Sequence, residues 1–303
     1  MTFWQIDFPA MLVAVLAALA AALVGNILVL RRQALMGDAL SHMVLPGIVA
    51  GYMISGAADS WAMAAGAMAA GLIGAGLIAA VQRLGKLDPA TAMGVVLTAM
   101  FAGGVLLLEA ADASNVHLDV EHALYGSLES AIWLWPTEWT DIFNPAGWTE
   151  LPTEVPLLLG ALFVLAVAFA VAFKEIRLTA FDPDYAVSLG LPAWATELLI
   201  NGAAALAVVA AFDAVGSILV IAMLICPAAT ARLLTDRFAM QVWVSLAFAV
   251  LIAIGGYAFA VLGAPALGAP AAINAAGAMA GVGGLVLGLA AWRYRARKKQ
   301  IIL

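Results

Sequence analysis

Residues 12–30 read LVAVLAALAAALVGNILVL, a stretch of 19 residues without a charged side chain. A helix needs about 20 apolar residues to cross a bilayer, whereas a barrel strand alternates in polarity over about ten residues. This stretch does not alternate, and similar apolar runs recur along the chain. Of the 303 residues, 65% are hydrophobic and 11% are charged, and the mean hydropathy is +1.06. The sequence therefore predicts an all-α, polytopic transmembrane helical bundle and excludes a barrel.

Nine apolar stretches, bounded by charges, prolines or turn residues, are long enough to span a membrane. They cover residues 9–30, 40–57, 61–81, 89–108, 156–173, 195–212, 214–231, 239–262 and 271–291. The first is too long, and lacks the basic flank, to be a cleaved secretory signal. With the N-terminus outside, all 13 Lys and Arg fall on the inner side, which is the asymmetry that orients membrane proteins. We therefore expect about nine spans, an outer N-terminus and a cytoplasmic tail from Arg293.

The long polar segment 109–154 contains carboxylates and four tryptophans but no Lys or Arg. We expect it to lie outside the cell as part of a single permease domain that covers residues 1–303. Its tryptophans suit the membrane interface, where an amphipathic ring sits at headgroup depth. Two interpretations remain open for this segment, an acidic outer cap and a vestibule that concentrates a cation before entry.

Three ionisable residues stand among the apolar spans, where a charge costs a few kcal/mol and marks a candidate functional site. Asp38 and His42 are four residues apart, so one helical face presents both a carboxylate and an imidazole, which suit Zn, Mn or Fe(II). Asp213 is a candidate third ligand. In the alternative, structural interpretation, Asp38 and Asp213 cap helices and His42 bonds a backbone carbonyl.

Two further features bear on this candidate site. Pro46 with Gly47, and Pro227, are expected to interrupt helices close to the candidate ligands. The glycines of residues 66–76 are expected to allow close helix packing.

Motifs of the common membrane and nucleotide enzymes are absent from the sequence. It has no HExxH, no GxSxG and no GxxxxGK[ST], so the chain is not expected to be an enzyme, and any ATP hydrolysis must come from a partner. Its one cysteine, Cys226, excludes a disulfide framework and an iron–sulfur cluster.

Three motifs, in this order and spacing, resemble the membrane subunit of the ABC-3 family of bacterial metal importers. They are LRRQALMGDALSHMVLPGIVAGYMI (30–54), LTAFDPDYAVSLGLPAWA (178–195) and VGSILVIAMLICPAATARLL (215–234), and the likeness extends over about residues 20–235. The resemblance implies a fold like that of cobalamin and siderophore importer permeases. It also implies a place in the bacterial cytoplasmic membrane, in lipid, and a second permease copy or a related permease as partner. The other implied partners are cytoplasmic ABC ATPase subunits and an extracytoplasmic metal-binding protein; no nucleic acid is expected.

The resemblance also makes residues 175–194 a cytoplasmic coupling segment that docks into the ATPase. This segment is short, follows Lys174, and mixes acidic, apolar and helix-stopping residues, so a plain surface helix is the alternative. The residues assigned to coupling are Phe181, Asp182, Pro183, Asp184, Tyr185, Leu189 and Gly190.

The function expected from these observations is import of a divalent Zn, Mn or Fe ion, with no permanently bound cofactor. The metal ligands assigned to this function are Asp38, His42 and Asp213. A permease for a metal chelate, an ion-coupled secondary transporter and a structural scaffold remain as alternatives. No internal repeat supports the secondary transporter, which would favour inverted halves.

Overall fold

The computed structural model describes residues 2–56, 60–110, 126, 128–136, 138–263 and 273–302, and these residues form helices joined by turns and irregular segments. Eight helical stretches in the described residues are long and apolar enough to cross a membrane. These stretches are Asp7–Leu30, Ala62–Gly85, Pro89–Ala110, Glu154–Val171, Trp194–Phe212, Ala214–Leu234, Phe238–Gly263 and Ala275–Arg297. They match eight of the nine predicted spans, so the predicted all-α polytopic bundle is confirmed.

The ninth predicted span, 40–57, is two short helices, α2 (Met36–Met43) and α3 (Leu45–Ser55). They meet at Val44, and Pro46 occupies the first turn of α3, where its missing N–H leaves no helical hydrogen bond unmade. The predicted interruption at Pro46 is therefore confirmed. Val44 itself keeps helical dihedral angles (φ −75°, ψ −18°), so the interruption is a local one between two consecutive short helices.

Residue contacts divide the chain into two compact units, and the chain passes between them several times. One unit comprises Met1–Asn26, Glu121–Val164 and Ala211–Leu303, and the other comprises Ile27–Val120 and Leu165–Ala210. The candidate ligands Asp38 and His42 and the whole coupling segment 175–194 belong to the second unit.

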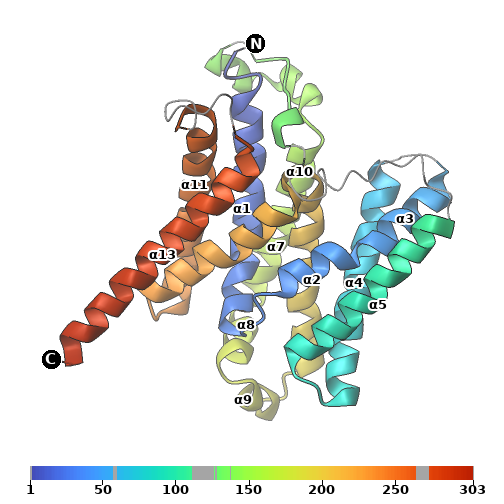
Figure 1. Cartoon of the computed structure of the whole chain (residues 1–303), viewed down its shortest axis with the longest axis vertical. Helices are drawn as coiled ribbons and strands as arrows, with labels where there is room; N and C mark the ends of the chain where they lie inside the picture. Colours follow the sequence, from blue (N-terminus) through green and yellow to red (C-terminus); the bar gives the residue numbers. More distant parts are fainter. Residues whose placement is uncertain are drawn as a thin grey trace. The chain divides into compact units, whose positions relative to one another are not determined.

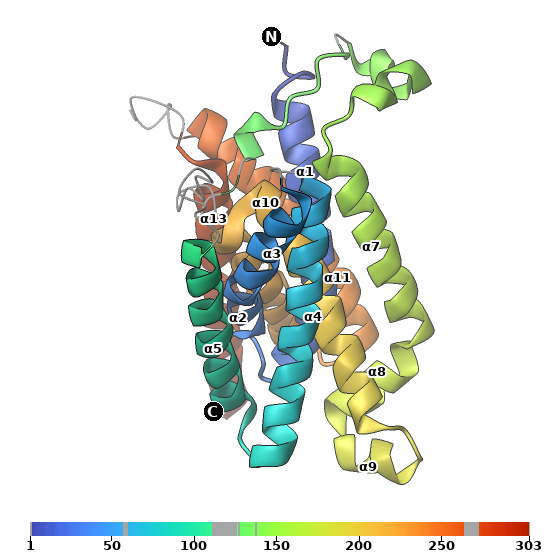
Figure 2. The ribbon, with the colours of Figure 1, turned by 90° about the vertical axis from the view of Figure 1, so that its right-hand side faces the viewer.

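In the second unit, α3 packs against both α4 (Ser60–Gly85) and α5 (Pro89–Ala110), and α2 lies along α5 (Figure 1 and Figure 2). The contact between α3 and α4 is made by Gly47 and Gly66, since a methyl group on either would collide with the carbonyl oxygen of the other. Lipid supplies no hydrophobic drive between helices, so such close backbone contact is a main source of their association. This confirms Gly66 as a packing glycine, whereas Gly76 faces open space.

The second unit also contains the end of α7 (Glu154–Val171) and the short helices α8 (Phe173–Phe181) and α9 (Pro183–Ser188), followed by the first half of α10 (Ala193–Leu234). In both views α9 follows α8 as a separate short helix before the chain enters α10 (Figure 1 and Figure 2).

The first unit contains α1 (Asp7–Leu30) up to Asn26, the second half of α10, α11 (Phe238–Ala258) and α13 (Ala275–Ile302). α11 continues as a π-helical turn at Phe259–Gly263 and packs against α13.

The irregularity in α10 lies at Gly216 and not, as expected, at Pro227. Gly216 has φ 71° and ψ 166°, a conformation open mainly to glycine, whereas Pro227 lies inside regular helix. Gly126 from the outer segment packs directly on the Val215–Gly216 backbone, with no room for a side chain. The prediction that Pro227 interrupts the helix was therefore wrong, because the helical conformation continues through Pro227 and the non-helical dihedral angles in α10 are those of Gly216.

The described part of the outer segment consists of the 3₁₀ turns Leu128–Ser130, Trp139–Phe143 and Pro145–Glu150. Trp133 is buried and its indole N–H donates to the Gly147 carbonyl oxygen at 3.0 Å, while Trp139 and Trp148 are exposed. Trp133 thus links two parts of the segment, and the rings of the two other tryptophans lie at its surface.

Candidate functional site

Helix α2 presents Asp38 and His42 on its one open face. Its other residues from Met36 to Met43 are buried, whereas the side chains of Asp38 and His42 are each 45% exposed. The His42 Nε2 and Asp38 Oδ1 atoms are 3.6 Å apart, as expected for residues one helical turn apart. The structure therefore brings these two predicted ligands together on an accessible surface of an otherwise buried helix.

The geometry of this pair is close to what one metal ion needs. Two ligand atoms held about 2.1 Å from a tetrahedral or octahedral ion lie about 3.0–3.4 Å apart. A small side-chain adjustment from 3.6 Å is enough to chelate one ion between Asp38 and His42. Imidazole and carboxylate together suit several first-row metals, among them Zn, Mn and Fe(II).

The structure argues against Asp38 as a helix cap. The N-cap position of α2 is Leu35, and no side chain makes a capping hydrogen bond there. Asp38 lies in the first turn of α2, where the helix dipole stabilises its negative charge, and its side chain is exposed.

The surroundings of His42 are apolar and fix its helix firmly. The imidazole meets the Phe101 ring of α5 edge-on, with ring centroids 6.0 Å apart. The neighbouring Met43 is fully buried and its sulfur packs against Gly74 of α4. Met43 therefore packs α2 against α4. The Asp38–His42 pair lies on the exposed side of this packed helix.

The third predicted ligand, Asp213, lies in α10 three residues before the kink at Gly216, and its side chain is outside the described part of the structure. Among the described residues, no group of three or more His, Cys, Asp or Glu side chains is placed to hold a metal. The described structure thus shows Asp38 and His42 as a close pair, and the metal role of Asp38, His42 and Asp213 remains a prediction.

The coupling segment forms the short helix α9 between α8 and α10. Asp182 caps α9, its Oδ1 accepting a hydrogen bond from the Tyr185 N–H at 3.0 Å, and Pro183 takes the first helical position. Gly190 ends the turn with φ 82°, a left-handed conformation that favours glycine. Asp182, Pro183 and Gly190 are thus explained by the local fold.

The remaining coupling residues form an exposed apolar surface. Phe181, Tyr185, Val187 and Leu189 are each more than half exposed, with values of 52, 52, 54 and 58%, and Asp184 is exposed beside them. Tyr185 and Val187 lie on α9 and Phe181 and Leu189 flank it, and exposed apolar side chains gathered in this way are typical of a protein contact. This arrangement favours a docking helix over a plain surface turn.

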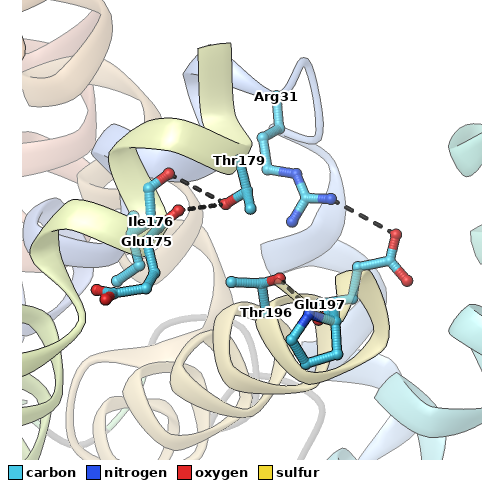
Figure 3. Close-up of polar contacts among 7 residues, drawn as sticks. Arg31, Glu175, Ile176, Thr179, Thr196 and Glu197 are labelled. Carbon is cyan, nitrogen blue, oxygen red and sulfur yellow. Dashed lines mark hydrogen bonds and ion pairs between the residues drawn. The ribbon is translucent and has the colours of Figure 1, made fainter. Parts of the chain in front are cut away.

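An ion pair that lies close to this segment was not predicted from the sequence. Arg31 and Glu197 form an ion pair with 3.6 Å between Nη2 and Oε1, and their side chains are 17% and 25% exposed (Figure 3). The sequence did contain an indication of it, because Glu197 is a charged residue within the apolar span predicted for residues 195–212.

A buried hydrogen-bonded network in the first unit was also missed. Asn26 donates from Nδ2 to the Ala22 carbonyl oxygen at 2.7 Å and to Ser245 Oγ at 2.6 Å, and Gln241 Nε2 donates to Asn26 Oδ1 at 3.2 Å. Asn26, Gln241 and Ser245 are fully buried. Such bonds link membrane helices, here α1 and α11, and the signal was an asparagine inside an apolar span.

Apolar helices long enough to cross a membrane, an Asp–His pair on an open helix face and a short helix with exposed apolar side chains around it are features that fit a membrane transport protein. The chain belongs to the ABC 3 transport family, which it matches over residues 4–131 and 151–281. It is therefore the membrane permease subunit of an ABC transporter and not the ATPase, and a multi-pass protein of a bacterial transporter. Membership of this family removes the secondary transporter and the scaffold from the alternatives.

Named relatives support this assignment. The chain is 39% identical over 247 residues to the manganese transport system membrane protein MntD of Bacillus subtilis, covering 81% of this chain and 80% of that protein. It is 36% identical over 220 residues to the zinc transport system membrane protein TroD of Treponema pallidum, covering 71% of this chain and 56% of that protein. The fold is also similar to that of a chain in the structure of PsaBC from Streptococcus pneumoniae in complex with Fab. In that comparison the TM-score is 0.70 and the identity 24%, over 93% of this chain and 89% of the other.

Proposed function

We propose that this chain is the permease of an ABC importer that moves manganese or zinc into the bacterial cytoplasm. The observation that carries the proposal is the Asp38–His42 pair on the open face of α2, with ligand atoms 3.6 Å apart. The manganese and zinc systems of the named relatives support the same two metals. A bare divalent ion fits this pair better than a metal chelate, whose coordination is already filled by the chelator.

The proposed site works because it is weak. An ion without protein ligands would face a large desolvation barrier in a low-dielectric path, whereas a full cage of ligands would trap it. Two side chains from α2, with water completing the coordination, lower the barrier without holding the ion for long. Asp213 is proposed as a third ligand at another point of the path. The metal is cargo, and no resident cofactor is proposed.

The proposed partners follow from the surfaces. Two cytoplasmic ATPase subunits are proposed to bind the exposed face of α9, one on each permease of a pair. A metal-binding protein outside the cell is proposed to deliver the ion to the acidic, tryptophan-bearing segment 109–154. The second permease, a copy of this chain or a related one, completes the pathway.

Uptake by the purified transporter tests the function directly. The permease is reconstituted in vesicles with its ATPase, and radiolabelled Mn²⁺ and Zn²⁺ are supplied with the binding protein. We expect ATP-dependent accumulation of one or both ions that excess chelator abolishes. Accumulation of a metal only in its chelated form would overturn the proposal in favour of a chelate permease.

The proposed topology has its own test. With Cys226 replaced by alanine, a cysteine at Thr149 is expected to react with a membrane-impermeant thiol reagent in intact cells. A cysteine at Arg297 is expected to react only after permeabilisation, because the positive residues are proposed to lie inside. The reverse pattern of labelling would contradict an outer N-terminus.

A further inference from the structure

Arg31 is close both to α2, which carries the candidate metal ligands, and to the coupling segment 175–194. It follows α1 directly, five residues before α2 begins at Met36. Its side chain reaches between α8 and the start of α10 toward Glu197 (Figure 3). These are the two helices that flank α9, and Arg31 forms its ion pair with the one that follows α9.

The connection from Arg31 to α2 is a tight turn. Arg32 has a left-handed φ of 58°, the Gln33 N–H donates to the Leu28 carbonyl oxygen at 2.8 Å, and the Met36 N–H donates to the Gln33 carbonyl oxygen at 3.0 Å. A displacement of Arg31 is therefore passed to α2 and not absorbed by a loose loop.

The flanks of α9 are equally well connected. Thr179 Oγ1 donates to the Glu175 carbonyl oxygen at 2.9 Å, which ties the last turn of α8 together, and the Ala186 N–H donates to the Asp182 carbonyl oxygen at 3.1 Å. α8 passes into α9 through the single residue Asp182. A force on α9 thus reaches α8 and α10 through short connections.

The charged groups around the Arg31–Glu197 ion pair are not fully hydrogen-bonded. The Arg31 Nη1 and Glu175 Oε2 atoms are both buried, and neither has a hydrogen-bond partner among the described residues. Figure 3 shows the Glu175 carboxylate directed away from Arg31. Burial lowers the pKa of Arg31 below its ordinary value, and the nearby Glu197 offsets this effect only in part.

A partly buried ion pair with unmet hydrogen bonds beside it is a poor source of stability. Desolvation of two charges can exceed their attraction, and a well-packed apolar pair is often as stable or more so. Leaving a buried charged group without a hydrogen bond adds a further cost. A second arrangement in which Arg31 pairs with Glu175 relieves both unmet atoms, which makes the cluster suited to two states.

We propose that Arg31 is a positioning residue that couples α9 to α2, pairing with Glu197 in one state of the transport cycle and with Glu175 in the other. The proposal rests on the proposed function, because it links α9, which is proposed to bind the ATPase, with α2, which carries the proposed metal ligands. When the ATPase moves α9, α8 and α10 shift against Arg31, the arginine changes partner, and α2 moves with it.

The ratio of metal transported to ATP hydrolysed tests this proposal in the complete transporter in vesicles. Arg31→Met, Glu197→Gln and Glu175→Gln are each expected to lower this ratio about tenfold or more. Arg83→Met, at an exposed arginine near the end of α4, is the matched control and is expected to keep the wild-type ratio. A wild-type ratio in Glu175→Gln would overturn the exchange of partners, and a wild-type ratio in Arg31→Met would overturn the whole proposal.

The double variant Arg31→Met/Glu197→Met separates coupling from folding. We expect its Tm to equal or exceed the wild-type value, since it replaces a buried ion pair by apolar side chains, while the ratio stays low. A wild-type ratio in this variant would refute a coupling role for the pair. Absence of Mn²⁺ and Zn²⁺ uptake by the wild-type transporter is a different result, because it contradicts the proposed function itself.

Discussion

Replacing His42 with alanine is expected to lower metal uptake by an order of magnitude or more without reducing the amount of folded transporter. The imidazole is half exposed, so its removal leaves no buried cavity, and the buried face of α2 remains intact. Loss of one of two ligands removes at least about 1.4 kcal/mol of the stabilisation that lowers the barrier to ion passage. Initial rates of radiolabelled Mn²⁺ and Zn²⁺ uptake in reconstituted vesicles measure the effect.

Asp38→Asn distinguishes a ligand from a structural residue, because it keeps the size of the side chain and removes its charge. We expect a similar tenfold loss of uptake. Leu35→Ala is the matched control, since Leu35 is 64% exposed at the start of the same helix and has no ligand atom. Uptake at the control level in both His42→Ala and Asp38→Asn would refute the site.

Replacing Leu189 with aspartate is expected to reduce metal-stimulated ATP hydrolysis of the assembled transporter by about tenfold or more. Leu189 is 58% exposed at the end of α9, and a charge in the centre of an apolar contact stays unpaired when the partner covers it. Asp184→Arg reverses a charge on the same surface and is expected to act in the same direction. Hydrolysis by purified complexes, with and without metal, measures both effects.

The control for this experiment is Leu87→Asp. It introduces the same charge at a leucine that is 40% exposed in the turn between α4 and α5, outside the membrane spans and in the same structural unit. The amount of permease inserted in the membrane should be equal in all variants, since the altered side chains are exposed. Stimulation at the wild-type level in Leu189→Asp would show that α9 is a plain surface helix.

The spans could be predicted because membrane insertion depends on composition and length, both of which can be read from the chain. The interruption of the span 40–57 could be predicted as well, because Pro46 can be read directly from the sequence. Gly216, in contrast, was missed as the kink in α10: glycine is common in packed membrane helices, and only the local dihedral angles distinguish a packing glycine from a bend.

The Asp38–His42 pair could be predicted because helical spacing alone brings residues four apart together. The Arg31 and Glu197 pair could not, because 165 intervening residues separate the partners and no local period relates them. Only the packing of α8 and α10 around the end of α1 brings these charges to 3.6 Å.

A double-mutant cycle of uptake rates tests most directly whether Asp38 and His42 hold the same ion. If they do, Asp38→Asn/His42→Ala should lose little more activity than either single variant, because the first substitution already abolishes the shared site. Rates for the wild type, both single variants and the double variant would be measured in the same vesicles. We predict a loss of about tenfold in all three variants, whereas losses that multiply to about a hundredfold in the double variant would show two independent sites and contradict the account.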